Sequence, residues 1–291
     1  MKLIIFLFLI TLILTLVGCS GNIPAISKYI QASLNAEALH PPKTAVIVPL
    51  FGTVSESWAS EVEKALQNSD NDLVVLWIES PGGSVITTKL LTHKLKVFQT
   101  KYNKPIYVYS EKVLASGAYW VAAAFEKIIL SPTGGAGSIG VYTIRADYSK
   151  LYDSSGIKHN FIASDSTKIM GHILNPMKDW ERKYIQRRIN AAHIAFMKHI
   201  WDYRSSQLID AYKIRNLRDV ITRQDTILVM YQFRQISNGI FYGANTASSA
   251  GLIDGIMYFD EFVEFLKLDG YKAVTIDGKI IVDFYPTEED K

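Results

Sequence analysis

The sequence has almost no cysteine: Cys19 is the only one among 291 residues. An internal disulfide is therefore impossible, and six scattered histidines do not supply the four-ligand spacing of a zinc site. We expect no metal and no cofactor. Neither sign of charge predominates, since 31 basic and 28 acidic side chains leave a net charge of +3. This near-balance gives no basic footprint for nucleic acid.

An apolar run occupies residues 3–17, directly after Lys2. It is shorter than the ~20 residues that a spanning helix needs and is typical of a signal-peptide core. The run ends in Gly18-Cys19-Ser20, which resembles the bacterial lipobox, where the peptide is cut before a cysteine whose thiol accepts the lipid. We predict a lipoprotein signal peptide over 1–18, a lipidated Cys19, and a protein anchored in the bacterial cell envelope on the extracytoplasmic, periplasmic side. The alternative is a short signal-anchor helix with an incidental cysteine.

Behind this segment the sequence predicts a tether and then an α/β domain. Residues 19–43 are polar and contain three prolines, as linkers do. Short apolar runs at 44–50, 73–78, 105–109 and 127–130 alternate with helical periodicity at 57–67, 84–102 and 118–125. This alternation predicts a mostly parallel sheet with helical crossovers. A long amphipathic helix is expected over 179–204.

Three glycine-containing motifs carry the candidate chemistry. ESPGGS (79–84) follows a strand, where glycines permit close approach of a substrate and free amides bind an oxyanion, although a purely structural turn fits equally well. LASGAYW (114–120) puts Ser116 at the start of a helix, the position of an ordinary cap or of an activated nucleophile. GGAGSIGV (134–141) lacks the lysine of a phosphate-binding loop, which disfavours nucleotide binding.

In this order the motifs resemble the signal peptide peptidase A (SppA) family of serine peptidases, which share the fold of the Clp protease subunit and the crotonases. The matching segments are LWIESPGGSV (76–85), VLASGAYWVAAAFEKIILSPTGGAGSIGVYT (113–143) and GIFYGANTASSAGLIDGI (239–256). The resemblance covers roughly residues 44–265 and implies a ClpP/crotonase-like superhelix of βαβ units. We assign the peptidase domain to 44–268 and a C-terminal extension to 269–291.

The family pattern, carried onto this sequence, makes Ser116 the nucleophile. The backbone N–H groups of Gly83 and Gly117 would form the oxyanion hole, and Gly82 would line the substrate pocket. The reaction would be peptide hydrolysis, with remnant signal peptides or other small membrane-associated peptides as substrates. Family members form ring-like homo-oligomers, and the resemblance implies the same here.

The family's general base is a lysine downstream, in a segment that corresponds here to SDSTK (164–168). Lys168 is therefore the expected base, with Ser138 orienting its amine, and the spacing favours a lysine from the same chain. Because a free lysine has a pKa near ~10.4, a base must be desolvated. We predict a buried Lys168 amine without a carboxylate partner; Asp165 would interfere if it pointed inward.

Several alternatives stay open at this point. Lys150 and Lys158 lie in the same region as Lys168, and His159 is the candidate base of a Ser-His-Asp triad. A catalytically inactive scaffold that binds peptides, or an acyl-CoA enzyme of the crotonase type, would use the same fold. Residues 205–237 form a longer segment than the family norm, and the sequence assigns them no role.

Overall fold

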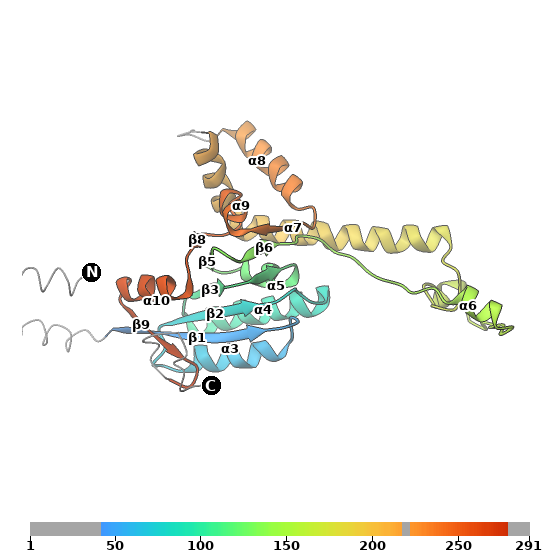
Figure 1. The fold of residues 1–291 in the computed structure, drawn as a ribbon, viewed down its shortest axis with the longest axis horizontal. Helices are drawn as coiled ribbons and strands as arrows, with labels where there is room; N and C mark the ends of the chain where they lie inside the picture. The colour runs from blue at the N-terminus through green and yellow to red at the C-terminus, as the bar shows by residue number, and fades with distance from the viewer. Residues whose placement is uncertain (1–41, 217–221, 279–291) are drawn as a thin grey trace, which may run out of the picture. The chain divides into compact units, whose positions relative to one another are not determined.

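The computed structural model describes residues 42–216 and 222–278. Its strands build a six-stranded sheet in the order β8-β5-β3-β2-β1-β9, in which every neighbouring pair is parallel (Figure 1). The strands are β1 (Lys43–Phe51), β2 (Leu73–Glu79), β3 (Ile106–Ser110), β5 (Lys127–Leu130), β8 (Gly255–Ile256) and β9 (Tyr271–Thr275). The predicted mostly parallel sheet with helical crossovers is confirmed. The predicted signal peptide and Cys19 lie outside the described residues.

Alternating side chains of the strands fill two separate apolar cores. In β1, Val46, Val48 and Leu50 face the core that also holds the buried faces of α3 (Ser57–Gln67) and α4 (Val85–Tyr102). Ala45 and Ile47 face the second core, against α10 (Phe259–Leu268). Burial on both faces explains why the strands are continuous apolar runs in the sequence.

The sheet continues past the predicted domain boundary. β9 lies within the segment that we assigned to a C-terminal extension, yet it pairs in parallel with β1 from Lys43↔Tyr271 to Ile47↔Thr275. The sequence signal was weak because β9 is short and only Ala273 and Val274 of it are buried. The folded unit therefore extends at least to Thr275.

A second, three-stranded sheet was not predicted. It has the order β4 (Val113–Ala115), β6 (Gly135–Gly137) and β7 (Phe241–Gly243). β4 and β6 are parallel, whereas β6 and β7 are antiparallel. Each strand is three residues long, too short to show a period in the sequence. This small sheet joins two of the glycine-containing motifs to the segment before α9 (Ala244–Ser249).

The long predicted helix begins where expected and runs further. α7 extends over Asp179–Asn216, and α8 (Arg223–Ile236) packs against it. Val229 and Phe233 of α8 are buried in the same core as Leu208 of α7. The segment 205–237 therefore packs on its own chain.

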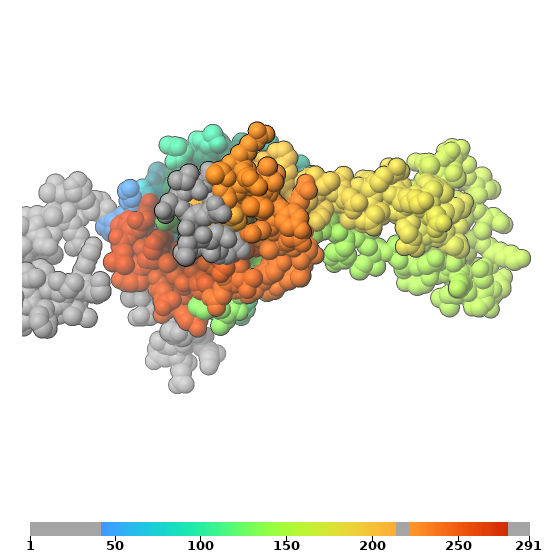
Figure 2. Space-filling view, turned by 90° about the horizontal axis from the view of Figure 1, so that it is seen from above, coloured from blue at the N-terminus to red at the C-terminus, as the bar shows by residue number. Residues whose placement is uncertain are grey.

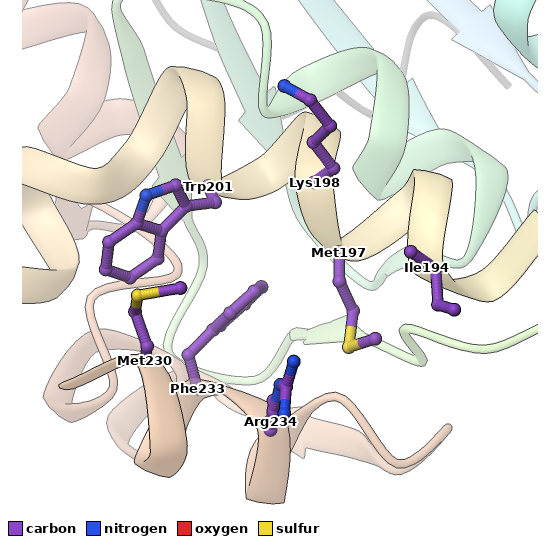
Figure 3. Close-up of a pocket in the computed structure, with 7 residues that line it drawn as sticks. All are labelled: Ile194, Met197, Lys198, Trp201, Met230, Phe233 and Arg234. Atoms are coloured by element: carbon purple, nitrogen blue, oxygen red, sulfur yellow. The ribbon is translucent and has the colours of Figure 1, made fainter. Parts of the chain in front are cut away.

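A cavity of about 260 Å³ remains between α7 and α8. Figure 3 shows its lining side chains: Ile194, Met197, Lys198, Trp201, Met230, Phe233 and Arg234.

An ion pair with a fully buried arginine connects α7 to the main sheet. The Arg204 guanidinium is fully buried and donates to both Asp254 carboxylate oxygens, at 2.7 and 3.0 Å, and to the Gly251 carbonyl oxygen at 3.3 Å. Asp254 also accepts a hydrogen bond from the backbone N–H of Ile128 in β5, at 2.7 Å. The pair thus connects α7, β5 and the turn before β8.

Among the helices that the structure describes, none is long and apolar enough to cross a membrane.

Candidate active site

The ends of neighbouring parallel strands bring the three motifs together. β2 ends at Glu79, and the next residue, Ser80, forms a parallel bridge with Leu114 of β4. In the small sheet Ala115 is paired with Gly137, and the Ser116 N–H donates to the Gly137 carbonyl oxygen at 2.8 Å. Carboxyl ends of parallel strands meet at one edge of a sheet, which is where ligands bind in α/β folds.

Ser116 and Ser138 occupy matching places at this edge, each one residue beyond a paired strand end. Both have a positive backbone φ, 51° for Ser116 and 50° for Ser138. Asn103, at the end of α4, is the only other non-glycine residue with a positive φ in the described part of the chain. Such conformations cost about 1–3 kcal/mol each and concentrate at functional sites. Both serines are partly exposed, so their hydroxyls are accessible.

The glycines predicted for the oxyanion hole lie directly beside the serine. Gly82 has a φ of +107°, and a Cβ placed on it would lie 2.7 Å from the Gly117 nitrogen and 2.8 Å from the Ser116 Cβ. A Cβ on Gly117 would lie 3.1 Å from the Gly83 nitrogen. Neither the Gly83 nor the Gly117 amide donates a hydrogen bond to a described residue. Two free amides therefore lie close to one hydroxyl, as stabilisation of an oxyanion requires.

Thr88 of α4 also contacts this cluster, and we did not predict it. Its hydroxyl is buried and has no hydrogen-bond partner among the described residues. A Cβ on Gly117 would lie 2.5 Å from this oxygen. The sequence gives no signal for this contact, since Thr88 lies in the helix that follows the first motif (79–84) and has the pattern of an ordinary buried helix position.

Gly117→Ala is expected to damage the site, because the added methyl group overlaps Thr88 Oγ1 and crowds Gly83. We expect a loss of about 1–3 kcal/mol in the free energy of unfolding, as for other overpacked cores. Urea denaturation measures this loss. In the double variant Gly117→Ala/Thr88→Ala the overlapping oxygen is absent, so much of the lost stability should return. A single variant as stable as the wild type would contradict the close packing described for Gly117.

Glu79 is a second residue that the sequence analysis did not single out. Its carboxylate accepts hydrogen bonds from the backbone N–H groups of Glu111, Lys112 (3.0 Å) and Val113 (2.9 Å), and from the Trp77 indole N–H at 3.0 Å. These bonds fix the turn that leads into β4 and hence the strand that ends at the nucleophile candidate. Glu79 is therefore a positioning residue for the site.

The structure does not bury the predicted base. Lys168 lies in the 3₁₀ helix η1 (Ser166–Ile169), where its side chain is exposed. Among the described residues, no hydrogen bond joins Lys168 to Ser116 or Ser138. The prediction of a buried amine is thus wrong for the single chain. The reason is that η1 belongs to a segment with few buried residues, which no sequence pattern could reveal.

The Asp165 carboxylate is bonded within its own turn and does not interfere at the candidate active site. Its carboxylate accepts hydrogen bonds from the Thr167 hydroxyl (2.6 Å) and backbone N–H (2.8 Å) at the start of η1. These two bonds, the hydroxyl first, lower the pKa of the exposed Asp165 carboxyl. Asp165 therefore stabilises the turn that carries Lys168.

The rival bases are exposed as well. Lys150 and Lys158 lie at the surface, and His159 is exposed while its ring packs edge-on against Tyr152 with centroids 4.8 Å apart. None of the three has a hydrogen bond to Ser116 among the described residues. The single chain thus presents the nucleophile candidate and its amides without a base beside them.

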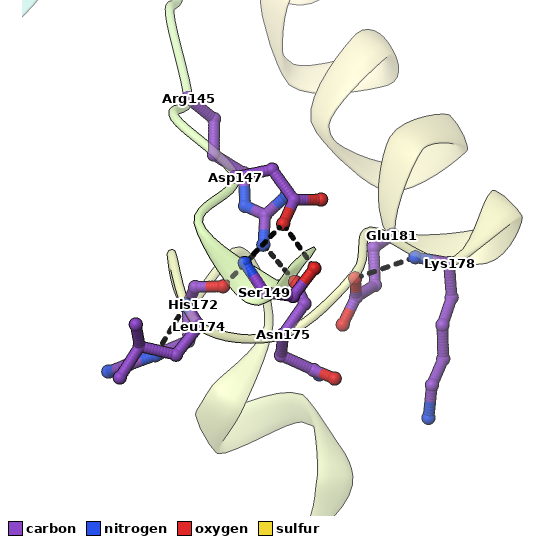
Figure 4. A network of polar contacts seen from close by, with 8 residues as sticks. All are labelled: Arg145, Asp147, Ser149, His172, Leu174, Asn175, Lys178 and Glu181. Carbon is purple, nitrogen blue, oxygen red and sulfur yellow. Dashed lines mark hydrogen bonds and ion pairs between the residues drawn. The ribbon is translucent and has the colours of Figure 1, made fainter. Parts of the chain in front are cut away.

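A polar network holds the segment that carries these candidates, residues 142–178, which we call the arm (Figure 4). The Arg145 guanidinium donates to the carbonyl oxygens of His172 and Asn175, which joins the two ends of the arm. The buried Glu181 carboxylate accepts from the Lys178 N–H at 3.0 Å at the start of α7. The arm is therefore a defined structure anchored to α7.

The arm nevertheless exposes many large apolar side chains. Ile144 is 83% and Ile162 100% exposed. In Figure 2 the yellow-green surface of the arm adjoins the yellow surface of α7, and no orange or red surface covers it on the face in view. Exposed apolar side chains in this number are a feature of interaction surfaces. Other exposed apolar residues of the arm are Tyr142, Tyr148, Leu151, Ile157 and Ile173.

The site has no arrangement for a metal. Within residues 42–216 and 222–278, no group of three or more His, Cys, Asp or Glu side chains could hold an ion. The chemistry available there is that of a hydroxyl, backbone amides and a base to be supplied.

Comparisons with known proteins identify the relatives of the chain. The model of peptidase family S49 matches residues 99–225, which include Ser116, Ser138 and Lys168. A protein named as a protease from Methanocaldococcus jannaschii is 30% identical over 200 residues, covering 64% of this chain and 63% of that protein. A protein named as an SppA signal peptide peptidase from Enterococcus faecium is 25% identical over 212 residues, covering 73% of this chain and 55% of that protein.

A solved structure of the 1510-N membrane-bound stomatin-specific protease with a substrate peptide is also similar. It is 11% identical, with a TM-score of 0.47 over 86% of this chain and 95% of that chain. The chain spans less than two thirds of the length of the two curated relatives described above, 63% and 55%.

Proposed function

The chain is an SppA-type member of peptidase family S49, and on that premise we propose that it is a serine endopeptidase with Ser116 as nucleophile and Lys168 as general base. The observation that carries the proposal is the cluster of Ser116 with the unbonded amides of Gly83 and Gly117. A strained serine beside two free N–H groups is the arrangement that acyl transfer needs.

The proposed reaction has two halves. The Lys168 amine takes the proton of the Ser116 hydroxyl as its oxygen attacks the peptide carbonyl carbon. The Gly83 and Gly117 amides donate to the resulting oxyanion. The C–N bond then breaks, the leaving amine receives the proton from the lysine, and an acyl ester remains on Ser116. Water, activated by the same lysine, hydrolyses the ester and regenerates the serine.

We propose that the lysine reaches the serine of a second copy of the chain. The spacing predicted a base from the same chain, but the exposure of Lys168 and its missing contact with Ser116 support assembly between copies. The exposed apolar surface of the arm would be buried at the same interface. Burial there would also remove the amine from water, which a lysine needs in order to act as a base. Ser138, beside Ser116, would orient the incoming amine.

Substrate class and location are part of the proposal. The lipobox-like Gly18-Cys19-Ser20 supports a lipid anchor at Cys19 and a site on the extracytoplasmic side of a bacterial membrane. Enterococcus faecium has a relative named as a signal peptide peptidase. Both observations support small membrane-associated peptides, such as remnant signal peptides, as substrates, with Gly82 lining their binding site.

The exposed Lys168 also favours one alternative, a catalytically inactive homologue that binds peptides. Peptide hydrolysis decides between the two. We expect the purified full chain to cleave a fluorogenic apolar peptide and Ser116→Ala to lose at least about 10³-fold in kcat/KM, as when other serine nucleophiles are removed. Equal rates for the two proteins would exclude Ser116 as nucleophile, and an inactive wild type that still binds the peptide would establish the alternative.

A further inference from the structure

A cavity of about 340 Å³ lies between α4, α5 (Gly117–Ala122) and α7, apart from the serine and its glycines. α4 contributes one face of side chains at helical spacing, and α7 contributes another. Trp120 of α5 lies between them. The complete lining is Lys89, Thr92, His93, Lys96, Trp120, Ala195, Lys198, His199, Asp202 and Tyr203.

Three aromatic rings stack along this cavity. Trp120 stacks on His199 with centroids 4.9 Å apart and an interplanar angle of 23°, and His199 packs on Tyr203 at 4.9 Å. Two ammonium groups lie near rings of this group. Lys89 Nζ is 5.4 Å from the centre of the Trp120 ring, and Lys96 Nζ is 5.4 Å from that of Tyr203. Both ammonium groups therefore line the same cavity as the three rings.

The cavity has an excess of positive charge. Its single carboxylate, Asp202, is paired with Lys198 at 2.6 Å. Lys96 donates to the Gln99 side-chain oxygen and the Ala124 carbonyl, which leaves one of its three N–H groups free. Lys89 forms no ion pair with a described carboxylate. Two ammonium groups with unused donors thus face a space without a counter-charge.

His199 contributes a neutral polar group to the same space. Burial lowers its pKa to about 4, and Lys89 and Lys96 act in the same direction, against the hydrogen bond to the Trp120 carbonyl oxygen and the Asp202 charge. The ring nitrogen Nε2 lies 2.9 Å from that carbonyl oxygen and donates to it while the imidazole is neutral. Nδ1 is then an acceptor that can receive a hydrogen bond from a hydroxyl of a ligand.

We infer that this cavity is a binding site for a phosphate-type oxyanion, held by Lys89 and Lys96 across the Trp120–His199–Tyr203 stack. Ammonium groups bind phosphate oxygens through charge-assisted hydrogen bonds. The cavity volume admits more than a bare phosphate, so a phosphate with an organic substituent over the rings would also fit. Two sources share this chemistry, namely a soluble phosphate compound and the headgroup of an anionic phospholipid.

Occupancy of this site would be communicated to the nucleophile through α5. Trp120 is four residues beyond Ser116, and its backbone N–H donates to the Ser116 carbonyl oxygen at 3.0 Å. The site is thus separate from the serine and its amides yet joined to them by one helical turn.

Calorimetric titration of the full chain tests this inference, with pyrophosphate for the soluble source and glycerophosphoglycerol for the lipid headgroup. We expect saturable binding of at least one of them. The variant Lys89→Gln/Lys96→Gln should weaken it at least about tenfold, because two charge-assisted bonds are lost. Lys94→Gln is the matched control, since Lys94 lies on the same helix but pairs with Glu56 at 2.9 Å. The affinity of this variant for the ligands should match that of the wild type.

The ligand that binds more tightly identifies the natural source, which is a soluble phosphate compound for pyrophosphate and a lipid headgroup for glycerophosphoglycerol. Absence of binding for both ligands, or equal affinity in the wild type and the double variant, overturns the inference. None of these outcomes depends on peptide cleavage, so the titration tests the anion site independently of the proposed peptidase activity. Circular dichroism of the double variant confirms that both replaced residues, which lie on the surface of α4, leave the fold intact.

Discussion

Two inactive variants are expected to restore each other's activity. Ser116→Ala lacks the proposed nucleophile and Lys168→Ala lacks the proposed base, so each alone should lose at least about 10³-fold in peptide cleavage. If the arm of one copy completes the site of the next, co-assembly at equal amounts leaves about one site in four with both groups in a closed ring of random composition. We therefore expect about a quarter of the wild-type rate. Co-expression from two tagged genes, tandem purification and the peptide assay measure it.

The control for this experiment is co-assembly of Lys168→Ala with the double variant Ser116→Ala/Lys168→Ala. No site in that mixture contains a lysine at 168, so activity should stay at background. Mixed assemblies of the two single variants that also stay at background would contradict a base supplied by another copy. The serine would then be served within its own chain, after a movement of the arm.

The same assay separates the candidate bases. Lys158→Ala and His159→Ala remove the rivals, which are exposed in the same arm. We expect both to keep at least about half of the wild-type rate, since substitutions of exposed residues away from buried contacts change little. If one of these two variants lost all peptide cleavage while Lys168→Ala kept it, the replaced residue would be the general base.

Loss of the buried arginine should have the largest effect on stability. Arg204→Met leaves the Asp254 carboxylate without its cation while Asp254 still accepts the Ile128 N–H. Each hydrogen bond to a charged group contributes about 1.5–3 kcal/mol, and the fully buried Arg204 donates two of them to the partly exposed Asp254 carboxylate. We expect the free energy of unfolding to fall by at least about 2 kcal/mol, which lowers the urea midpoint while the slope is unchanged. Peptide cleavage measured at low temperature, where the variant is folded, should persist.

The matched control is Lys213→Ala, on the same helix. Lys213 pairs with Asp210 at 3.1 Å, but both side chains are exposed to solvent. Such surface pairs contribute about 0–1 kcal/mol, so this variant should differ little from the wild type. Equal stability of Arg204→Met and Lys213→Ala would show that the buried pair does not connect α7 to the sheet in the way described.

Prediction from the sequence worked where a local pattern has one structural solution. Continuous apolar runs become strands buried on both faces, and residues 57–67 and 84–102 become α3 and α4 within a residue of the expected bounds. The family resemblance placed Gly83 next to Ser116 and Gly117, and the structure brings these residues together where neighbouring strands end. β4, β6 and β7 were missed, since three residues carry no periodicity.

The sequence by itself determined the parallel sheet, which follows from local periodicity. Its motifs also carry the family resemblance, and that resemblance implies the grouping of Ser116 with Gly83 and Gly117. Only the tertiary structure decided that Gly117 touches Thr88, that Glu79 fixes the turn before Ser116, and that Lys168 is exposed. Contacts of this kind join residues that are distant in the chain. Whether a side chain ends up buried depends on what packs against it, and no single stretch of sequence contains that information.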